Sequence, residues 1–216
     1  LKEYVNQEGK NSNGYKRTPL SAAIKNKHAD IKMYLIEHGV DLHKAYKEEF
    51  QRGTPLVCAC EKGRFEDVKL LITGYNDVND SNGNNNNNMT LKEYVNQFGR
   101  NSYGVENTPL MVAAKNEDFQ VVKYLIEQGE ADPNIADSSN GQNALHFAAY
   151  YNKKDTKVIE LLLTNMSLNS VNKKESRWGR TPLDMAYTYG SPIKQEIRDL
   201  IRSKGEKGGS ELNKKT

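Results

Sequence analysis

The residues of this 216-residue chain that could perform chemistry are four histidines, two cysteines and 28 carboxylates. Catalytic and metal sites need such residues at defined spacings, as in the HExxH zinc motif, paired CxxC motifs, the GxSxG nucleophile turn and the phosphate-binding GxxxxGK[ST] loop. None of these motifs occurs in the sequence. We therefore expect a protein that is not an enzyme, with no catalytic residue, no metal site and no cofactor.

The histidines and cysteines have structural interpretations instead. His28 lies between two predicted helices, and His146 lies inside a repeated motif described below. Cys58 and Cys60 are two residues apart in a predicted helix, so their side chains diverge by about 200° and cannot form an ordinary disulfide with each other. Unpaired cysteines favour a reducing compartment. We expect an intracellular protein, either cytoplasmic or in the host cell cytoplasm if it is an effector.

A repeated tripeptide indicates the elements that position these residues. Thr-Pro-Leu occurs four times, and Asn-Ala-Leu is an altered further copy. Thr or Asn can cap a helix, and proline at the first helical position loses no needed donor. Small residues, a polar break and a second apolar segment follow each copy, which predicts two helices per unit. The copies begin at Thr18, Thr54, Thr108, Asn143 and Thr181, with spacings of 36, 54, 35 and 38 residues.

The second helices are predicted around residues 31–36, 68–72, 121–126, 158–163 and 193–201. We expect the first four of them to end near Gly39, Gly74, Gly129 and Asn165, which tolerate the left-handed conformation that closes helices. Such a two-helix unit cannot bury its own apolar face, so the units must stack.

The pattern resembles the ankyrin repeat, whose signature Thr-Pro-Leu-His-x-Ala and period near 33 residues match it. The resemblance implies an all-α solenoid of helix-turn-helix units with short β-turn fingers. Only His146 retains the signature histidine, so the hydrogen bonds of that imidazole are mostly missing or replaced in the other repeats. The repeats are expected at about residues 15–45, 50–78, 104–135, 140–172 and 178–205, with an insertion at 74–104, a remnant helix and finger of a preceding repeat at 1–14, and a flexible tail at 206–216.

A longer period of 90 residues is superimposed on the repeats. Residues 1–40 align with residues 91–130 without a gap and with 22 identities, which indicates duplication of a two-repeat block. Within it, a Leu-Lys-Glu-Tyr-Val segment places its apolar residues on one face of a short helix, which Thr90 could cap in the second copy. This helix either packs under an elongated finger and stabilises it, or the finger reaches a partner. The Asn-rich residues 76–89 are expected to form a polar loop.

Charge and hydropathy limit the classes of partner. The net charge of +3 is too small to indicate nucleic-acid binding, although residues 173–216 carry 11 basic and 6 acidic side chains. No apolar stretch approaches the roughly 20 residues that span a bilayer. We expect a protein partner, with no nucleic acid, no membrane and no small-molecule substrate. The start at Leu1, without Met or a leader, is interpreted as the start of a fragment.

The resemblance also locates the contact residues. In ankyrin arrays the residues just before the tripeptide form the finger tips, and those seven and eight positions after its Thr line the concave face. Among the positions that this counting gives, the predicted contacts are Arg17, Lys25, Glu106, Asn107, Lys115, Gln142, Tyr150, Tyr151, Arg177, Trp178, Arg180 and Tyr189.

The large aromatic side chains of this set belong to its last two repeats, and Trp, Tyr and Arg are enriched among the residues that dominate binding energy. We expect Tyr150, Tyr151, Trp178, Arg180 and Tyr189 to form one patch. Alternatively, the tyrosines pack against the adjacent repeat and Trp178 supports its own finger.

The predicted function is a non-catalytic module that binds a protein or peptide on its fingers and concave face. The alternative is a targeting array of a larger effector or toxin-like protein, whose enzymatic domain lies outside this sequence.

Overall fold

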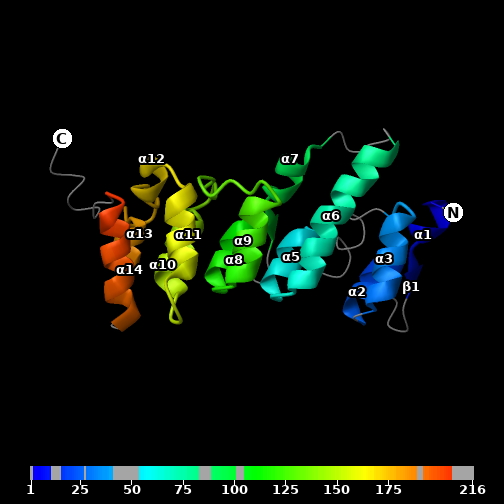
Figure 1. Cartoon of the computed structure of the whole chain (residues 1–216), viewed down its shortest axis with the longest axis horizontal. Helices are drawn as coiled ribbons and strands as arrows, with labels where there is room; N and C mark the ends of the chain where they lie inside the picture. Colours follow the sequence, from blue (N-terminus) through cyan, green and yellow to red (C-terminus); the bar gives the residue numbers. More distant parts are fainter. Residues whose placement is uncertain are drawn as a thin grey trace.

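The helices of the protein stack side by side in one elongated row. The computed structural model describes residues 2–10, 16–26, 28–40, 54–82, 89–100, 105–188 and 192–205. The N-terminal helices form one end of the row and the C-terminal helices the other (Figure 1). The predicted tail at 206–216 and residues 83–88 of the Asn-rich tract lie outside the described residues.

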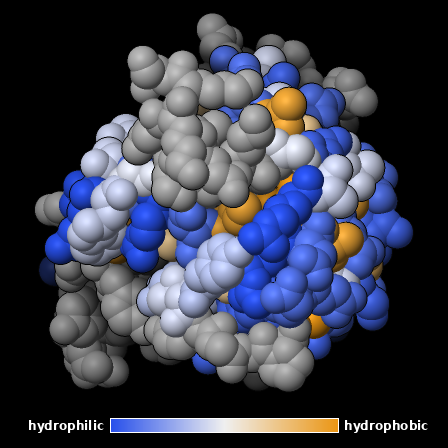
Figure 2. All heavy atoms as spheres, turned by 90° about the vertical axis from the view of Figure 1, so that its left-hand side faces the viewer, coloured by the Kyte–Doolittle hydropathy of each residue, from blue (hydrophilic) through white to orange (hydrophobic). Residues whose placement is uncertain are grey.

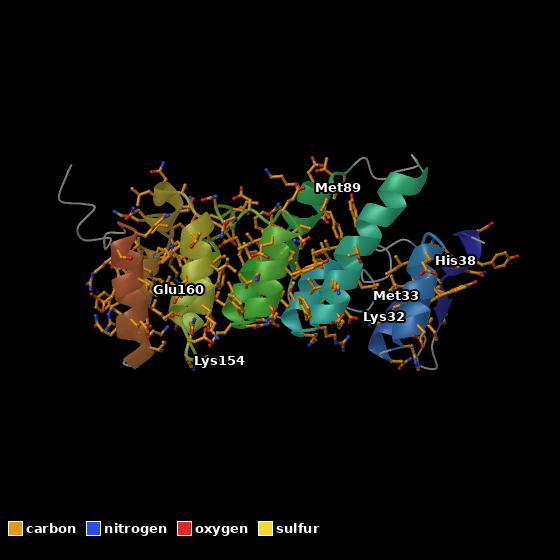
Figure 3. All side chains as sticks on the ribbon, viewed as in Figure 1. Lys32, Met33, His38, Met89, Lys154 and Glu160 are labelled. Atoms are coloured by element: carbon orange, nitrogen blue, oxygen red, sulfur yellow. The ribbon has the colours of Figure 1, made fainter. Side chains whose placement is uncertain are left out.

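Five helix pairs follow one another in the described part of the chain. They are α2 (Pro19–Lys25) with α3 (Ala29–Glu37), α5 (Pro55–Glu61) with α6 (Phe65–Asn82), α8 (Pro109–Lys115) with α9 (Phe119–Glu127), α10 (Ala144–Tyr151) with α11 (Lys157–Asn165), and α13 (Pro182–Met185) with α14 (Pro192–Ser203). Lys154 marks the turn between α10 and α11 at the lower edge of the row (Figure 3).

Short helices and two-stranded hairpins complete the fold. The helices are α1 (Lys2–Val5), α7 (Leu91–Val95) and α12 (Leu168–Val171). Strand β1 (Gly9–Lys10) pairs with β2 (Lys16–Arg17), and β3 (Gly99–Arg100) pairs with β4 (Glu106–Asn107), both antiparallel. The predicted all-α solenoid with short β fingers is confirmed.

The first helix of four pairs begins as the tripeptide predicts. The side-chain oxygens of Thr54, Thr108, Asn143 and Thr181 each accept a hydrogen bond, at 3.2–3.3 Å, from the backbone N–H three residues later. Each bond satisfies one of the N–H groups that a helix start leaves without an intrahelical partner. The tripeptide is therefore a helix start signal in physical terms.

In several repeats, the residue at the position of the signature histidine contacts the backbone nitrogen of the capping residue, and its side chain differs between repeats. His146 Nδ1 lies 3.2 Å from the backbone nitrogen of Asn143, and the Asp184 carboxylate accepts the N–H of Thr181 at 2.8 Å. Met111 places its sulfur 3.5 Å from the nitrogen of Thr108. Burial lowers the pKa of His146 to about 4, against the opposing effect of nearby backbone carbonyls, so the imidazole is neutral at pH 7. The histidine is thus replaced functionally in two of the repeats.

The core runs through the whole row between the helices. The leucine of the tripeptide is buried in all five pairs, and so are both members of the Ala113-Ala114 and Ala148-Ala149 pairs. Cys58 and Cys60 are buried in α5 as reduced thiols. Burial raises the pKa of the Cys60 thiol, which keeps it protonated and unreactive.

Only one of the four residues expected in the left-handed conformation adopts it. Gly39, with a φ of 75°, follows α3 as expected. After α9 the left-handed residue is Glu130, with a φ of 56°, rather than Gly129. Helix α11 ends at Asn165 and continues into extended backbone at Met166. Gly129 serves close packing instead, because a Cβ there would lie 2.8 Å from a backbone oxygen.

The prediction that the second helix of its pair ends near Gly74 is wrong. Helix α6 continues through Gly74 to Asn82, so residues 76–82 of the predicted loop are helical. Tyr75 stacks on Tyr94 of α7, with ring centres 4.4 Å apart, and its hydroxyl donates to the carbonyl of Met89. These long-range contacts stabilise the helix just beyond the glycine. They could not be predicted from the residues next to Gly74.

Gly74 allows α6 to approach α3 closely. A Cβ at this position would lie 2.4 Å from Cγ2 of Ile36. We expect Gly74→Ala to lower the free energy of unfolding by about 1–2 kcal/mol, because the clash outweighs the gain of about 0.5–1 kcal/mol in helix propensity. Urea unfolding followed by circular dichroism measures the change. The exposed control Thr73→Ala should stay within about 0.5 kcal/mol of wild type, and a stabilised Gly74→Ala variant would contradict the expectation.

The two copies of the 90-residue duplication fold alike. Gly9 pairs with Arg17 in the first hairpin and Gly99 pairs with Asn107 in the second, each 90 residues later. Thr90 caps α7 as predicted, with Glu93 closing a reciprocal capping box. Helix α7 packs on α6 through its buried apolar face.

Candidate partner-binding surface

Two loops in the C-terminal half have the same internal architecture. The Asp137 carboxylate accepts hydrogen bonds from the backbone N–H groups of the second, third and fifth residues after it, at 2.5–3.0 Å. The Glu175 carboxylate accepts from the same three positions of its own loop, at 2.7–3.1 Å. Each acid therefore holds its finger loop in one conformation by satisfying three backbone donors.

A glycine in the fourth position after the acid permits this turn. Gly141 and Gly179 have φ values of 69° and 65°, in the left-handed region that glycine adopts without strain. The Ser176 N–H donates to the carbonyl of Asn140 at 2.7 Å, which joins the two loops. Sequence analysis missed both organising acids. An acid four residues before a glycine was the available signal.

The Glu175 loop presents the single tryptophan of the chain. The Trp178 side chain is 60% exposed, and the guanidinium carbons of Arg177 and Arg180 lie 4.2 and 4.4 Å from its ring centre. Cations at these distances are attracted to the face of the indole. We call these three residues the finger cluster. Trp178 thus contacts arginines of its own loop, while most of its surface remains exposed to solvent.

A second cluster lies at the C-terminal end of α10. The rings of Tyr150 and Tyr151 meet edge to face at 4.8 Å, and the Lys115 ammonium lies 5.0 Å from the centre of the Tyr151 ring. Tyr151 is exposed, whereas Tyr150 is half-buried and packs against the core. We call these three residues the groove cluster. It combines an aromatic surface with one positive charge.

A buried lysine of α14 binds the end of α10 that carries the groove cluster. The Lys194 ammonium donates hydrogen bonds to the carbonyls of Ala149 and, at 2.7 Å, Tyr150. Burial lowers the pKa of Lys194 to about 8, although the Glu117 carboxylate opposes this shift. The lysine satisfies carbonyls that the end of α10 leaves without intrahelical partners. It thereby ties the last helix of the array to the tyrosine pair.

The structure separates the predicted patch into two parts. The finger cluster belongs to the loop beside the N-terminal end of α10, because Ser176 bonds Asn140 just before that helix. The groove cluster lies at the other end of α10, and an eight-residue helix is about 12 Å long. The expectation of one patch is therefore corrected to two clusters, which a partner would have to bridge.

The Glu175 carboxylate is the electrostatic centre of the finger cluster. Burial raises the pKa of Glu175, but hydrogen bonds from the backbone N–H groups of Arg180, Trp178 and Arg177, with the Arg180 guanidinium, together hold it below the usual 4.5. The carboxylate is therefore ionised at neutral pH. Because the folded-state pKa is lowered, the stabilisation is present above about pH 4.5 and is lost as the pH falls through the folded value.

We expect Glu175→Ala to loosen the finger, because it leaves three backbone donors without their acceptor. The loss of folding free energy should be about 2 kcal/mol. Fluorescence of Trp178, the only tryptophan, should shift at neutral pH towards that of a solvated indole. Glu175→Gln is the matched control for charge, since it keeps one acceptor oxygen. Its fluorescence should lack the acid transition that wild type shows below about pH 4.5, and an identical transition in both proteins would contradict the role of Glu175.

The other predicted contact residues have different positions. Glu106 is exposed and pairs with Arg100, with Nε 3.1 Å from the carboxylate. Asn107 is only 3% exposed, so its side chain is turned inward and cannot meet a partner. Gln142 is half-buried, and its backbone bonds to Asp137. Arg17 lies in β2, Lys25 ends α2, and Tyr189 lies outside the described residues.

The first helix of the last pair is shorter than the register predicts. Helix α13 ends at Met185, four residues after the Thr that begins its tripeptide. Helix α14 begins at Pro192, and residues 189–191 lie outside the described residues.

An aromatic residue at the C-terminal end was not among the predicted contacts. Tyr187 is exposed, with the guanidinium carbons of Arg198 and Arg202 at 4.7 and 5.8 Å from its ring centre. Viewed from this end, the described surface is largely hydrophilic with smaller apolar patches (Figure 2). The two arginines thus lie over the exposed ring of Tyr187.

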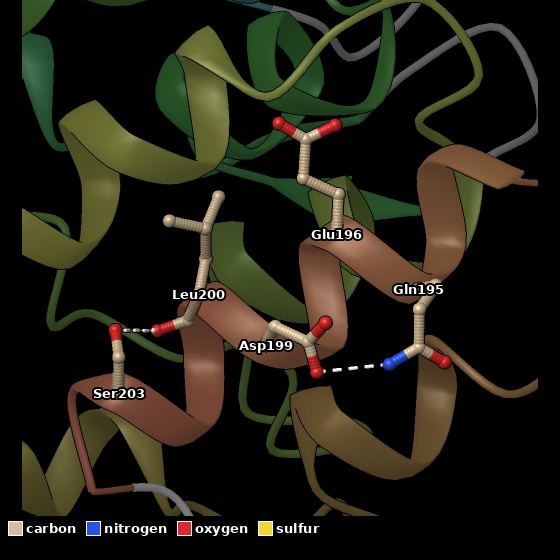
Figure 4. Close-up of a pocket in the computed structure, with 5 residues that line it drawn as sticks. All are labelled: Gln195, Glu196, Asp199, Leu200 and Ser203. Carbon is tan, nitrogen blue, oxygen red and sulfur yellow. Dashed lines mark hydrogen bonds between the residues drawn. The ribbon is translucent and has the colours of Figure 1, made fainter.

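No group of three or more His, Cys, Asp or Glu side chains that could hold a metal ion occurs in the described part of the chain. A depression on α14 is lined by Gln195, Glu196, Asp199, Leu200 and Ser203 (Figure 4). Its polar groups bond one another: Gln195 donates to Asp199 at 2.9 Å, and Ser203 donates to the Leu200 carbonyl at 2.6 Å. This arrangement has no converging set of ligand groups.

Membrane-spanning helices are likewise absent from the residues that the structure describes, where each helix is too short or too polar to cross a bilayer.

Comparison with known proteins matches this architecture. A family model described as ankyrin repeats matches residues 1–82, 81–172 and 110–211. An ankyrin repeat protein of Fowlpox virus is 30% identical over 185 residues, which are 85% of this chain and 46% of the relative.

Two further relatives are larger proteins of other kinds. Alpha-latrocrustotoxin-Lt1a of Latrodectus tredecimguttatus is 35% identical over 124 residues, 57% of this chain and 7% of the toxin. The NAD-dependent deacetylase sir2B of Dictyostelium discoideum is 25% identical over an alignment of 232 positions, which covers 91% of this chain and 28% of the deacetylase. The chain spans less than half the length of each of these three relatives.

Proposed function

Because this chain belongs to the ankyrin repeat family, whose repeats are protein–protein interaction modules, we propose that it binds a protein or peptide partner through the finger and groove clusters. The observation that carries the proposal is the exposed Trp178, whose ring is contacted by two guanidinium groups on a loop organised by Glu175. Large aromatic and arginine side chains are the ones most enriched among residues that dominate interface energy.

The geometry of the finger cluster suits tight binding. Three backbone hydrogen bonds fix the loop, and the stacked arginines restrict the indole, so little conformational freedom is lost when a partner docks. The side chains of Arg177, Arg180 and Lys115 are positively charged, and that of Arg177 is exposed. The best-matched partner therefore has an apolar pocket for Trp178 with an acidic rim, and a second apolar contact for Tyr151.

The proposed module is non-catalytic and intracellular. The buried thiols of Cys58 and Cys60 support a reducing compartment. The alternative is a targeting array within a larger effector or toxin-like protein. It is supported by the partial coverage of the relatives, one of which is named as a toxin. An open reading frame that encodes an enzymatic domain next to this array would favour the alternative.

Affinity capture tests the proposed surface. The immobilised chain is incubated with a cell lysate, and bound proteins are identified by mass spectrometry for wild type, Tyr151→Ala/Trp178→Ala and the control Tyr187→Ala. A true partner is retained by wild type and the control and lost from the double variant. A partner retained equally by all three proteins would place the binding site elsewhere.

A further inference from the structure

The N-terminal end of the row exposes large apolar side chains of two helices. Tyr4 of α1 is 73% exposed, and Ile31 and Tyr34 of α3 are 49% and 51% exposed. We call these three residues the N-terminal face. Helices α1 and α3 form this end of the row, where Figure 3 labels His38 on α3 (Figures 1 and 3).

The duplicated copy shows the same positions covered. Ninety residues later, Tyr94 is 1% exposed, Val121 is 0% exposed and Tyr124 is half-buried. Tyr94 stacks on Tyr75, with ring planes 7° apart, and Tyr124 meets Phe65 edge-on at 5.7 Å. Both covering rings belong to α6, the second helix of the preceding pair.

Among the described side chains of α3, Ile31 and Tyr34 are the ones more exposed than their counterparts. Lys32 and Ile36, on the side of α3 that packs on α6, are buried, and so are Leu35 of α3 and its counterpart Leu125. Met33 is exposed, and so is its counterpart Lys123. The two copies therefore share a fold and differ in whether a helix covers the positions of Tyr4, Ile31 and Tyr34.

We propose that the N-terminal face is the docking site for a helix pair of the α5–α6 type that precedes residue 1 in the complete protein. The second helix of that pair would carry aromatic side chains at the positions of Phe65 and Tyr75, which cover this face in the second copy. The 90-residue duplication supports this occupant, because the unit that covers copy two has no counterpart covering copy one among the residues that the structure describes.

The chemistry of the other end argues against a second copy of this chain as the occupant. Head-to-tail stacking would place the C-terminal end of one chain on the N-terminal face of the next. That end presents Tyr187 under the guanidinium groups of Arg198 and Arg202, with the exposed Gln195 and Asp199 nearby on α14. Burying these charged groups against tyrosine and isoleucine side chains would cost their hydration without providing partners.

A tandem protein tests the proposal directly. Residues 54–90 are fused ahead of residue 1 of the full chain, which reproduces the natural junction between residues 90 and 91. Hydrogen exchange of the α3 amides is then compared with that of the parent chain. We expect at least tenfold greater protection of these amides in the tandem protein, because the added helix pair covers the N-terminal face.

Point variants make the comparison specific. Ile31→Glu should remove at least tenfold of the protection in the tandem protein and change the parent chain less than twofold. Met33→Glu, on the same helix but outside the N-terminal face, should change both proteins less than twofold. Equal exchange in tandem and parent proteins would overturn the proposal, whether the added pair stays unfolded or folds apart from α3. Concentration-dependent dimers of the parent, abolished by Ile31→Glu in sedimentation experiments, would overturn it in favour of a second copy.

Discussion

Replacing Asp67 with alanine should lower the free energy of unfolding of the first two helix pairs by about 3–5 kcal/mol. The Asp67 carboxylate of α6 forms a buried ion pair with the Lys32 ammonium of α3, and Arg64 lies 3.7 Å from its other oxygen. Removing the acid leaves the ammonium buried without a counter-charge. Because the opposite side of α3 is the exposed N-terminal face, we expect α2 and α3 to detach first.

Hydrogen exchange of α3 and α6 amides, with urea unfolding, measures this loss segment by segment, which suits a repeat protein that unfolds in parts. The double variant Lys32→Met/Asp67→Leu should recover most of the stability, since it removes both charges and fills their space. The control Lys157→Ala removes an exposed pair with Asp155 and should cost less than about 1 kcal/mol. If Asp67→Ala lowers the free energy of unfolding by less than about 1 kcal/mol, the ion pair is not what holds the first two helix pairs together.

The double variant Tyr151→Ala/Trp178→Ala should weaken binding of a captured partner by about 2–4 kcal/mol, mainly through faster dissociation. Each single variant should contribute separately. Tyr151 lies at the C-terminal end of α10 and Trp178 on the loop beside its N-terminal end, so their effects should add within about 0.5 kcal/mol. Surface plasmon resonance on purified partner and variants gives both the affinity and the dissociation rate.

Thermal unfolding of the same variants separates binding from folding. Both side chains are exposed, so the melting temperatures should match that of wild type within a few degrees. Tyr187→Ala removes another exposed aromatic side chain of the last repeat and should leave affinity unchanged. If the double variant binds as wild type does, the better candidate for the binding site is the finger formed by β3 and β4, where Val105 and Glu106 are exposed. If it unfolds, the aromatic side chains belong to the packing between repeats.

Local sequence determined the repeat architecture of this protein. The helix starts at Thr54, Thr108, Asn143 and Thr181 follow from capping and from proline geometry, which depend on residues within one turn. The matching hairpins 90 residues apart follow from the duplicated segment. Apolar spacing placed the second helices, because an amphipathic segment must turn its apolar side towards a neighbour. These features could be predicted because each depends on neighbours in the chain.

Tertiary structure alone decided how the candidate surface is divided and supported. Lys194 reaches α10 from 44 residues away, and Ser176 joins its loop to Asn140 36 residues earlier. Counting along the repeat placed the tyrosine pair and Trp178 in one patch, but the length of α10 keeps them apart.

Long-range contacts also decided where α6 ends and which apolar side chains are left uncovered. Helix α6 continues beyond Gly74 because Tyr75 stacks on Tyr94. The side chains of Ile31 and Tyr34 are exposed because no helix in the described residues covers them, whereas α6 covers their counterparts. The physical reason is the same in each case. A side chain's burial and partners depend on which distant residues fold beside it, and identical local sequences acquire different environments at different places in the row.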